Sequence, residues 1–121
     1  MWIAYWAAAG SLTALFLVAG VTKLLRSRTA LKTAGMGYVD DFTDAQVKLI
    51  GAAEIAGAAG LILPMLSGIA MGLSPVAGFS LAALMAGAVI THARRGEPFL
   101  VPLVLAVGSV AAAVLGLLLL G

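Results

Sequence analysis

Long apolar runs alternate with short polar segments along the chain, and this alternation sets the expected architecture. The first run covers about residues 2–22, and a longer stretch at about 47–90 contains only two charged residues. As one helix that stretch would be roughly 65 Å long, about twice the hydrocarbon core of a bilayer, so it must turn back once. The turn is expected at about 65–75, where the residues that disfavour helix are Pro64, Gly68, Gly72 and Pro75.

The pattern therefore predicts an all-α fold, an integral membrane four-helix bundle that forms one domain over residues 1–121. Its spans are expected at about 2–22, 45–65, 75–93 and 99–120. Composition agrees, because 63% of the residues are hydrophobic and only 10% are charged. Soluble domains are about one quarter charged, so this chain cannot cover a water-facing surface, and the lipid bilayer is its expected surrounding.

The basic residues add an orientation. All seven lysines and arginines lie after the first span, after the third span, or just inside the second. Four spans place these positions at one end of the bundle, and the positive-inside bias then puts both termini on the non-cytoplasmic side. Arg94 and Arg95 are interpreted mainly as topology signals at the rim. Topology also accounts for the net charge of +2, so nucleic acid is not an expected partner.

Composition also excludes several kinds of chemistry. The chain has no cysteine, so it cannot itself carry thiol redox chemistry, thiolate metal ligation or a disulfide. Its single histidine, His92, supplies too few ligands for a zinc or bis-imidazole haem site built by one chain. No metal site and no catalytic centre of its own is predicted, and the catalytic residues, if any, stay unknown.

The loop after the first span carries local signals. "RSRTALKTAG" predicts a short surface helix ended by Gly35 and Gly37, with an irregular loop as the alternative. "TDAQ", Thr43 to Gln46, has the spacing of a capping box that starts the second span. Glu97 is expected as a solvated loop residue. Aromatic side chains expected at the membrane interface are Trp2, Tyr5, Trp6, Tyr38 and Phe42.

Glu54 stands alone as a carboxylate within the second span. It follows the predicted cap by about ten residues, and an ionised group at that depth costs several kcal/mol unless it is paired or hydrated. Gly51, Gly57 and Ala58 lie three or four positions away on its face, so neighbouring helices can approach closely there. We therefore expect Glu54 to face the bundle interior, with the glycines serving packing.

Lys23 and His92 are the expected neighbours of Glu54. Side chains lean toward the N-terminus of their helix, so Glu54 leans toward the charged end while Lys23 and His92 lean inward from it. The three are predicted to form a ligand-binding or proton-relay cluster. A structural Lys23–Glu54 pair and an interfacial His92 are the alternatives.

At these residues the chain resembles the DoxX-like family of small bacterial four-helix membrane proteins. The similar segments are "AGVTKLL" (19–25), "MGYVDDFTDAQVKLIGAAEIAGAAGLILP" (36–64) and "THARRGEP" (91–98). The resemblance implies a four-helix bundle in the bacterial plasma (inner) membrane, with recurrent polar positions at Lys23, Glu54 and His92. It also implies association with oxidoreductases or a role in protein assembly, without one settled activity.

Three functions compete on these grounds. The first is an accessory or anchor subunit of a membrane oxidoreductase that contacts a quinone through the Glu54, His92 and Lys23 cluster. The second is a non-catalytic interaction or assembly module, which would work with a protein partner or as a homo-oligomer. The third is a small proton-coupled transporter, which the single orientation and the absence of an acidic residue in the first span disfavour. A quinone is the one cofactor that enters these hypotheses, and none is certain.

Overall fold

Four long helices form the body of the molecule in the computed structural model, which describes residues 1–121. They are α1 (Trp2–Leu25), α3 (Asp44–Ser67), α4 (Leu73–Arg94) and α5 (Leu100–Leu120). Each is long and apolar enough to cross a membrane. A short helix α2 (Arg28–Thr33) and a 3₁₀ turn η1 (Gly37–Asp41) lie between α1 and α3, and there are no strands. The predicted all-α four-helix bundle is confirmed.

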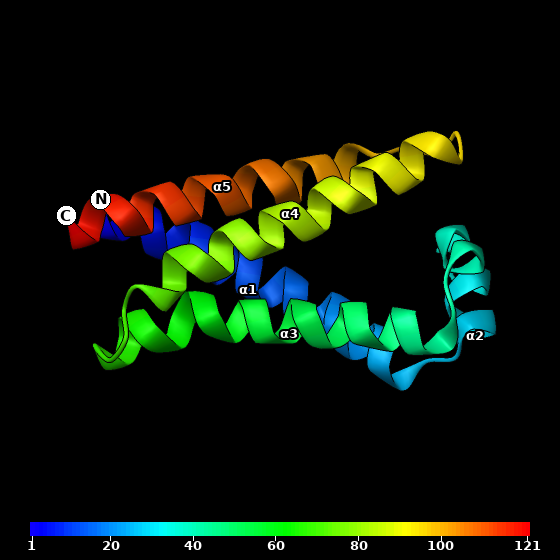
Figure 1. The fold of residues 1–121 in the computed structure, drawn as a ribbon, viewed down its shortest axis with the longest axis horizontal. Helices are drawn as coiled ribbons and strands as arrows, with labels where there is room; N and C mark the ends of the chain where they lie inside the picture. The colour runs from blue at the N-terminus through cyan, green and yellow to red at the C-terminus, as the bar shows by residue number, and fades with distance from the viewer.

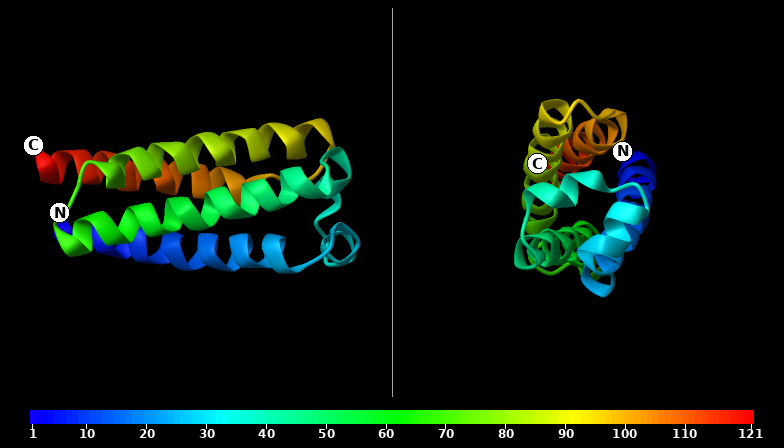
Figure 2. Two further views of the ribbon diagram at one scale, coloured as in Figure 1. Left: turned by 60° about the horizontal axis from the view of Figure 1, so that its bottom comes forward. Right: turned by 90° about the vertical axis from the view of Figure 1, so that its right-hand side faces the viewer.

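The helices run up and down, so each is antiparallel to its neighbours along the chain (Figure 1). Contacts join α1 to α3, α3 to α4, α4 to α5 and α5 back to α1, which closes a ring. Both termini lie at one end of the bundle, together with the turn between α3 and α4. The α2–η1 segment lies across the opposite end (Figure 2, right).

Helix boundaries follow the local signals. Thr43 and Gln46 form the predicted capping box, with hydrogen bonds of 3.1 and 2.9 Å, and α3 therefore begins at Asp44. The predicted surface helix exists as α2, and it ends in a Schellman motif in which Gly35 takes a left-handed φ of +99°. Gly68 ends α3 with φ +73°. The four long helices end within three residues of the segments expected from hydropathy.

The core near the termini is closed by neutral hydrogen bonds onto α3. Pro64 has no N–H, so the carbonyl of Gly60 loses its helical donor. The Ser74 hydroxyl of α4 donates to that oxygen at 2.9 Å, and the Tyr5 hydroxyl of α1 donates to the Leu61 carbonyl at 2.6 Å. Both side chains are completely buried. In a bilayer, where water cannot serve, the Ser74 hydroxyl replaces the donor that Pro64 removes, while the Tyr5 hydroxyl adds a further bond from α1 to α3.

Tyr5 is a correction to the sequence analysis. It was expected in an aromatic belt, but it is buried against α3 and belongs to the core with Phe16, Leu61 and Leu81. Trp2 is 45% exposed and has the position expected of a belt residue. The hydroxyl of Tyr5 explains the difference, because it has a partner in the interior.

Candidate functional site

A buried ion pair joins α1 to α3 in the half of the bundle nearer the charged end. The Nζ of Lys23 lies 2.5 Å from Oε1 of Glu54, and the two side chains are only 8% and 2% exposed. The last turn of α1 supplies the lysine, and the middle of α3 supplies the carboxylate. The expected proximity of these two residues is therefore present.

Two glycines let α1 and α3 approach closely enough for this pair to form. A Cβ added at Gly20 would lie 2.6 Å from the Gly51 carbonyl oxygen, and one added at Gly51 would lie 2.8 Å from the Gly20 oxygen. The backbones of α1 and α3 thus touch one turn before each charged residue. Such close approach at small residues is the usual way membrane helices pack, and it leaves Lys23 and Glu54 facing each other in direct contact.

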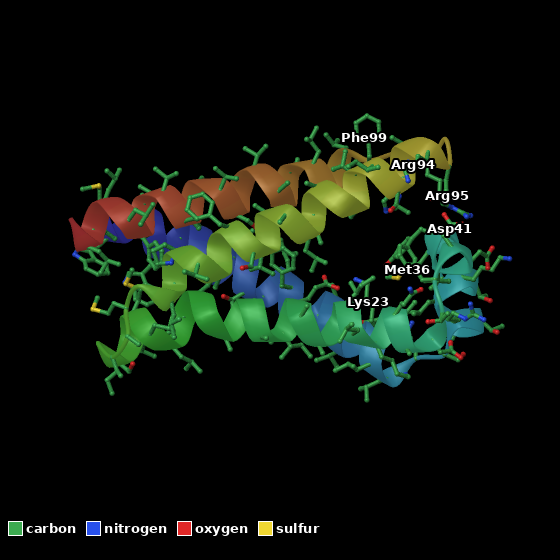
Figure 3. All side chains as sticks on the ribbon, in the orientation of Figure 1. Lys23, Met36, Asp41, Arg94, Arg95 and Phe99 are labelled. Carbon is green, nitrogen blue, oxygen red and sulfur yellow. The ribbon has the colours of Figure 1, made fainter.

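Beside the pair lies a cavity of about 240 Å³, between α3 and α4 under the α2–η1 segment. Its wall is mostly apolar, and its polar side chains are Lys23, Tyr38, Thr91 and His92. Figure 3 shows Lys23 pointing from α1 into the bundle interior, toward the space between α3 and α4. Glu54 does not line the cavity, because it lies behind Lys23. The remaining lining residues are Phe42, Ile50, Leu84, Met85, Gly87 and Ala88.

His92 lines the cavity with its imidazole ring, and one ring nitrogen is buried on the side of Glu97. This nitrogen, Nδ1, has no hydrogen-bond partner, and the nearest carboxylate oxygen, Oε1 of Glu97, is 3.6 Å away. The Tyr38 ring lies 5.1 Å from the imidazole, centroid to centroid. A buried polar atom without a protein partner is uncommon.

Gly96 sets the position of the carboxylate beside His92. It takes φ +68°, and the Glu97 N–H donates to the His92 carbonyl at 2.9 Å, the long-range bond of a Schellman motif. This turn folds Glu97 back over the last turn of α4. Glu97 is therefore not the freely solvated residue expected from sequence, since its side chain is 28% exposed and accepts a hydrogen bond from Arg95 at 3.1 Å.

The α2–η1 segment covers the mouth of the cavity with Tyr38 and Phe42. Its own small core consists of Leu31, Val39 and Val47, all buried. Val47 belongs to α3, so this core fastens the segment to the bundle. Tyr38 and Phe42 are partly buried, and both contribute to the cavity wall. Their expected place at the lipid interface stays a prediction.

A second attachment uses charges. Arg95 donates to Asp41 of η1 at 2.9 Å while it also holds Glu97. Figure 3 shows Arg95 and Asp41 facing each other between the end of α4 and η1. Arg94, next in sequence, is exposed. The two arginines predicted together as rim residues thus differ, because only Arg95 ties the rim to the covering segment.

Tyr38 is protonated at neutral pH. Burial raises the pKa of its phenol, and the nearby ammonium of Lys23 opposes that rise without reversing it. The hydroxyl donates a weak hydrogen bond to the sulfur of Met36, 4.0 Å away, and lies beside the Lys23 side chain. Tyr38 is therefore a hydrogen-bond donor available at the cavity, and the sequence analysis did not include it in the predicted site.

Of the three predicted site residues, the structure brings Lys23 and Glu54 into contact and places His92 on the same cavity wall as Lys23. His92 and Glu54 make no direct bond. The residues missed were Tyr38, Phe42 and Glu97. No pattern within "GYVDDF" indicates that this segment folds back over the helix ends; the hydrophobic spacing of Leu31, Val39 and Val47 is the signal that could have shown it.

The chain matches the family model of the DoxX-like family over residues 7–119. It therefore belongs to the DoxX-like family, as the resemblance of its three segments indicated. No curated protein and no solved structure matches it.

Proposed function

We propose that this DoxX-like protein is a membrane subunit that holds the headgroup of a quinone for a membrane oxidoreductase. The observation that carries the proposal is the cavity of about 240 Å³ whose mostly apolar wall also includes Lys23, Tyr38 and His92. The cavity combines apolar surface with a few polar groups, the composition typical of sites for small organic ligands.

The size of the cavity limits its occupant. Pockets for drug-sized ligands are roughly 300–1,000 Å³, so a volume of about 240 Å³ suits one substituted ring and excludes a dinucleotide. The ring must also come from a lipid-soluble molecule, because the cavity lies between membrane-spanning helices. A quinone meets both conditions.

The polar groups suit a ring that bears two carbonyl oxygens. The imidazole of His92 donates to one oxygen from a protonated ring nitrogen, and the Tyr38 hydroxyl or the Lys23 ammonium donates to the other. Reduction of a quinone to a quinol takes up two electrons and two protons, and groups of this kind can supply protons. Glu54 holds the Lys23 side chain in place through their hydrogen bond. The electrons come from a partner protein, which makes this chain an accessory or anchor subunit.

The assembly-module hypothesis keeps one observation in its favour. Lys23 and Glu54 satisfy each other at the tightest contact between α1 and α3, so the pair also serves as a packing element. Under that hypothesis the cavity is filled by lipid, and its volume has no consequence for activity.

Filling the cavity separates these functions. Gly87 lines the cavity, and a Cβ built there meets nothing within 4 Å, so Gly87→Leu adds bulk inside the cavity without a backbone clash. Gly10 on α1 is equally free of neighbours and lies on the exposed surface, which makes Gly10→Leu the matched control. The proposal expects Gly87→Leu to abolish quinone-dependent turnover of the complex that co-purifies from native membranes.

Two variants of the predicted cluster complete the experiment. His92→Ala and the double variant Lys23→Met with Glu54→Gln, which leaves no unpaired buried charge, should lower the same turnover while the complex still assembles, and Gly10→Leu should behave as the unmodified protein does. If all three site variants assemble and turn over normally, the cavity does not serve a quinone and the assembly function replaces the proposal.

Orientation belongs to the same proposal. We place the charged end in the cytoplasm of a bacterium, with both termini outside it, on the positive-inside bias. A cysteine in place of Ser27 should be labelled by an impermeant reagent only from the cytoplasm, and one in place of Ser67 only from the outside. Labelling of both from one side contradicts the four-span topology.

A further inference from the structure

A second hollow runs along the membrane-facing seam between α3 and α4. It measures about 560 Å³, and small or apolar side chains form its floor. Ala53 and Ala56 on α3, and Val76 and Ser80 on α4, are exposed along it. The one hydroxyl among these four, that of Ser80, is already bonded to the Val76 carbonyl of its own helix at 2.8 Å. The groove therefore presents no free polar side chain and suits a hydrocarbon.

This groove adjoins the headgroup cavity. Leu84 belongs to the walls of both. On α3 the cavity ends at Ile50 and the groove begins at Ala53, one turn further along the same face. On α4 the groove passes back from Leu84 to Ser80 and Val76, again at helical spacing. The cavity and the groove are thus neighbours that share Leu84, with polar side chains on the wall nearer the charged end and apolar ones further along the helices.

We infer that the groove between α3 and α4 holds the hydrocarbon chain of the same ligand whose ring occupies the cavity. The ligand class is then a ring-sized headgroup with a single long apolar chain. The inference rests on the proposed function, because it assigns the chain of the ligand proposed there. Leu84 to Val76 spans eight residues, about 12 Å of helix, so the groove follows a chain over several carbons.

Binding of the hydrocarbon chain in the groove depends on steric fit. Lipid tails are as apolar as the groove, so no hydrophobic gain favours entry, and the fit of the chain to small side chains is what counts. A bulky residue at Ala53, beside the cavity, should therefore exclude any chain. One at Val76, about 12 Å from Leu84 along α4, should disturb only a longer chain.

The test is equilibrium binding of radiolabelled benzoquinones to the purified chain in nanodiscs. One probe carries a methyl group and the other a decyl chain on the same ring. Ala53→Phe should weaken binding of the decyl probe on the order of tenfold, about 1.4 kcal/mol, and leave the methyl probe unchanged. Ala52→Phe is the matched control, since Ala52 is exposed on α3 and lines neither the cavity nor the groove.

Each outcome decides between the two proposals. If neither probe binds the unmodified protein, the headgroup site fails and the groove assignment fails with it. If both probes bind but Ala53→Phe and Ala52→Phe behave alike, the headgroup site stands and the groove holds only ordinary lipid. If Ala53→Phe weakens both probes equally, the substitution acts on the cavity and the chain assignment is wrong.

Discussion

Buried polar groups need hydrogen-bond partners at both ends of the bundle, and the two ends supply them in different ways. At the end that holds the termini, buried polar groups are hydroxyls, and Tyr5 and Ser74 both donate to carbonyl oxygens of α3. At the other end they are ionisable groups, and only the Lys23–Glu54 pair is fully satisfied, while Nδ1 of His92 lacks a partner. The first end is closed around its own backbone. The second end contains a cavity and ionisable side chains that are not needed to satisfy the helix backbone.

The difference shows where polarity serves structure and where it exceeds structural need. Pro64 creates the need for Ser74, because it removes the donor to the Gly60 carbonyl. Nothing in the backbone near α4's last turn creates a similar need for His92, whose carbonyl is already bonded to Glu97. Polar groups without a structural purpose are the better candidates for function.

The largest effect is expected when the ion pair at the charged end is broken. Lys23→Met leaves Glu54 buried without a partner, and we expect a loss of about 3–5 kcal/mol in the free energy of unfolding. Glu54→Gln should cost a similar amount because Lys23 is then unpaired. The double variant should recover most of the loss. Detergent-denaturation titrations in mixed micelles measure all three, and a double variant no more stable than the worse single would contradict the pair.

The next largest effect tests the close contact between α1 and α3 beside this pair. Gly20→Ala places a Cβ 2.6 Å from the Gly51 oxygen, and overpacking of this kind costs about 1–3 kcal/mol. Gly10→Ala is the control, because it meets no atom and gains up to about 1 kcal/mol of helix propensity. Equal stability of the two variants in the same titration would show that α1 and α3 do not approach as closely as described.

The smallest effect tests the neutral end. Ser74→Ala leaves the Gly60 carbonyl without a donor, and a loss of about 0.6–1.5 kcal/mol is expected. Ser80→Ala, six residues along α4, removes a hydroxyl that bonds only within its own helix, so it should change stability little. A Ser74→Ala variant as stable as Ser80→Ala would mean that Pro64 needs no compensation.

Much of the fold could be predicted because its signals are local. Hydropathy marks the four spans, and the capping box of Thr43 and Gln46 marks the start of α3 at Asp44. Lys23 and Glu54 could also be paired, since a charge inside a membrane requires a partner and helix direction limits the choice. These deductions use one element or two adjacent ones.

What the sequence did not reveal depends on three or more elements. Tyr5 looks like an interfacial residue until its hydroxyl meets α3. Tyr38 becomes part of a site only because α2 and η1 fold across the helix ends, fastened at Val39 and Arg95. Glu97 is placed by the left-handed turn at Gly96, and its meeting with Arg95 follows from that turn. Periodicity carries no record of such tertiary contacts.

The concentration of charge at one end also bears on how the chain enters a membrane. All charged side chains belong to one half of the molecule, and the turn between α3 and α4 carries none. The tip of the α3–α4 hairpin can therefore cross the bilayer without carrying an ion through hydrocarbon, which is the costly part of translocation. In the orientation proposed above, the apolar length of this hairpin drives its insertion against the cost of one buried carboxylate, Glu54, and the arginines and lysines stay behind on the cytoplasmic side.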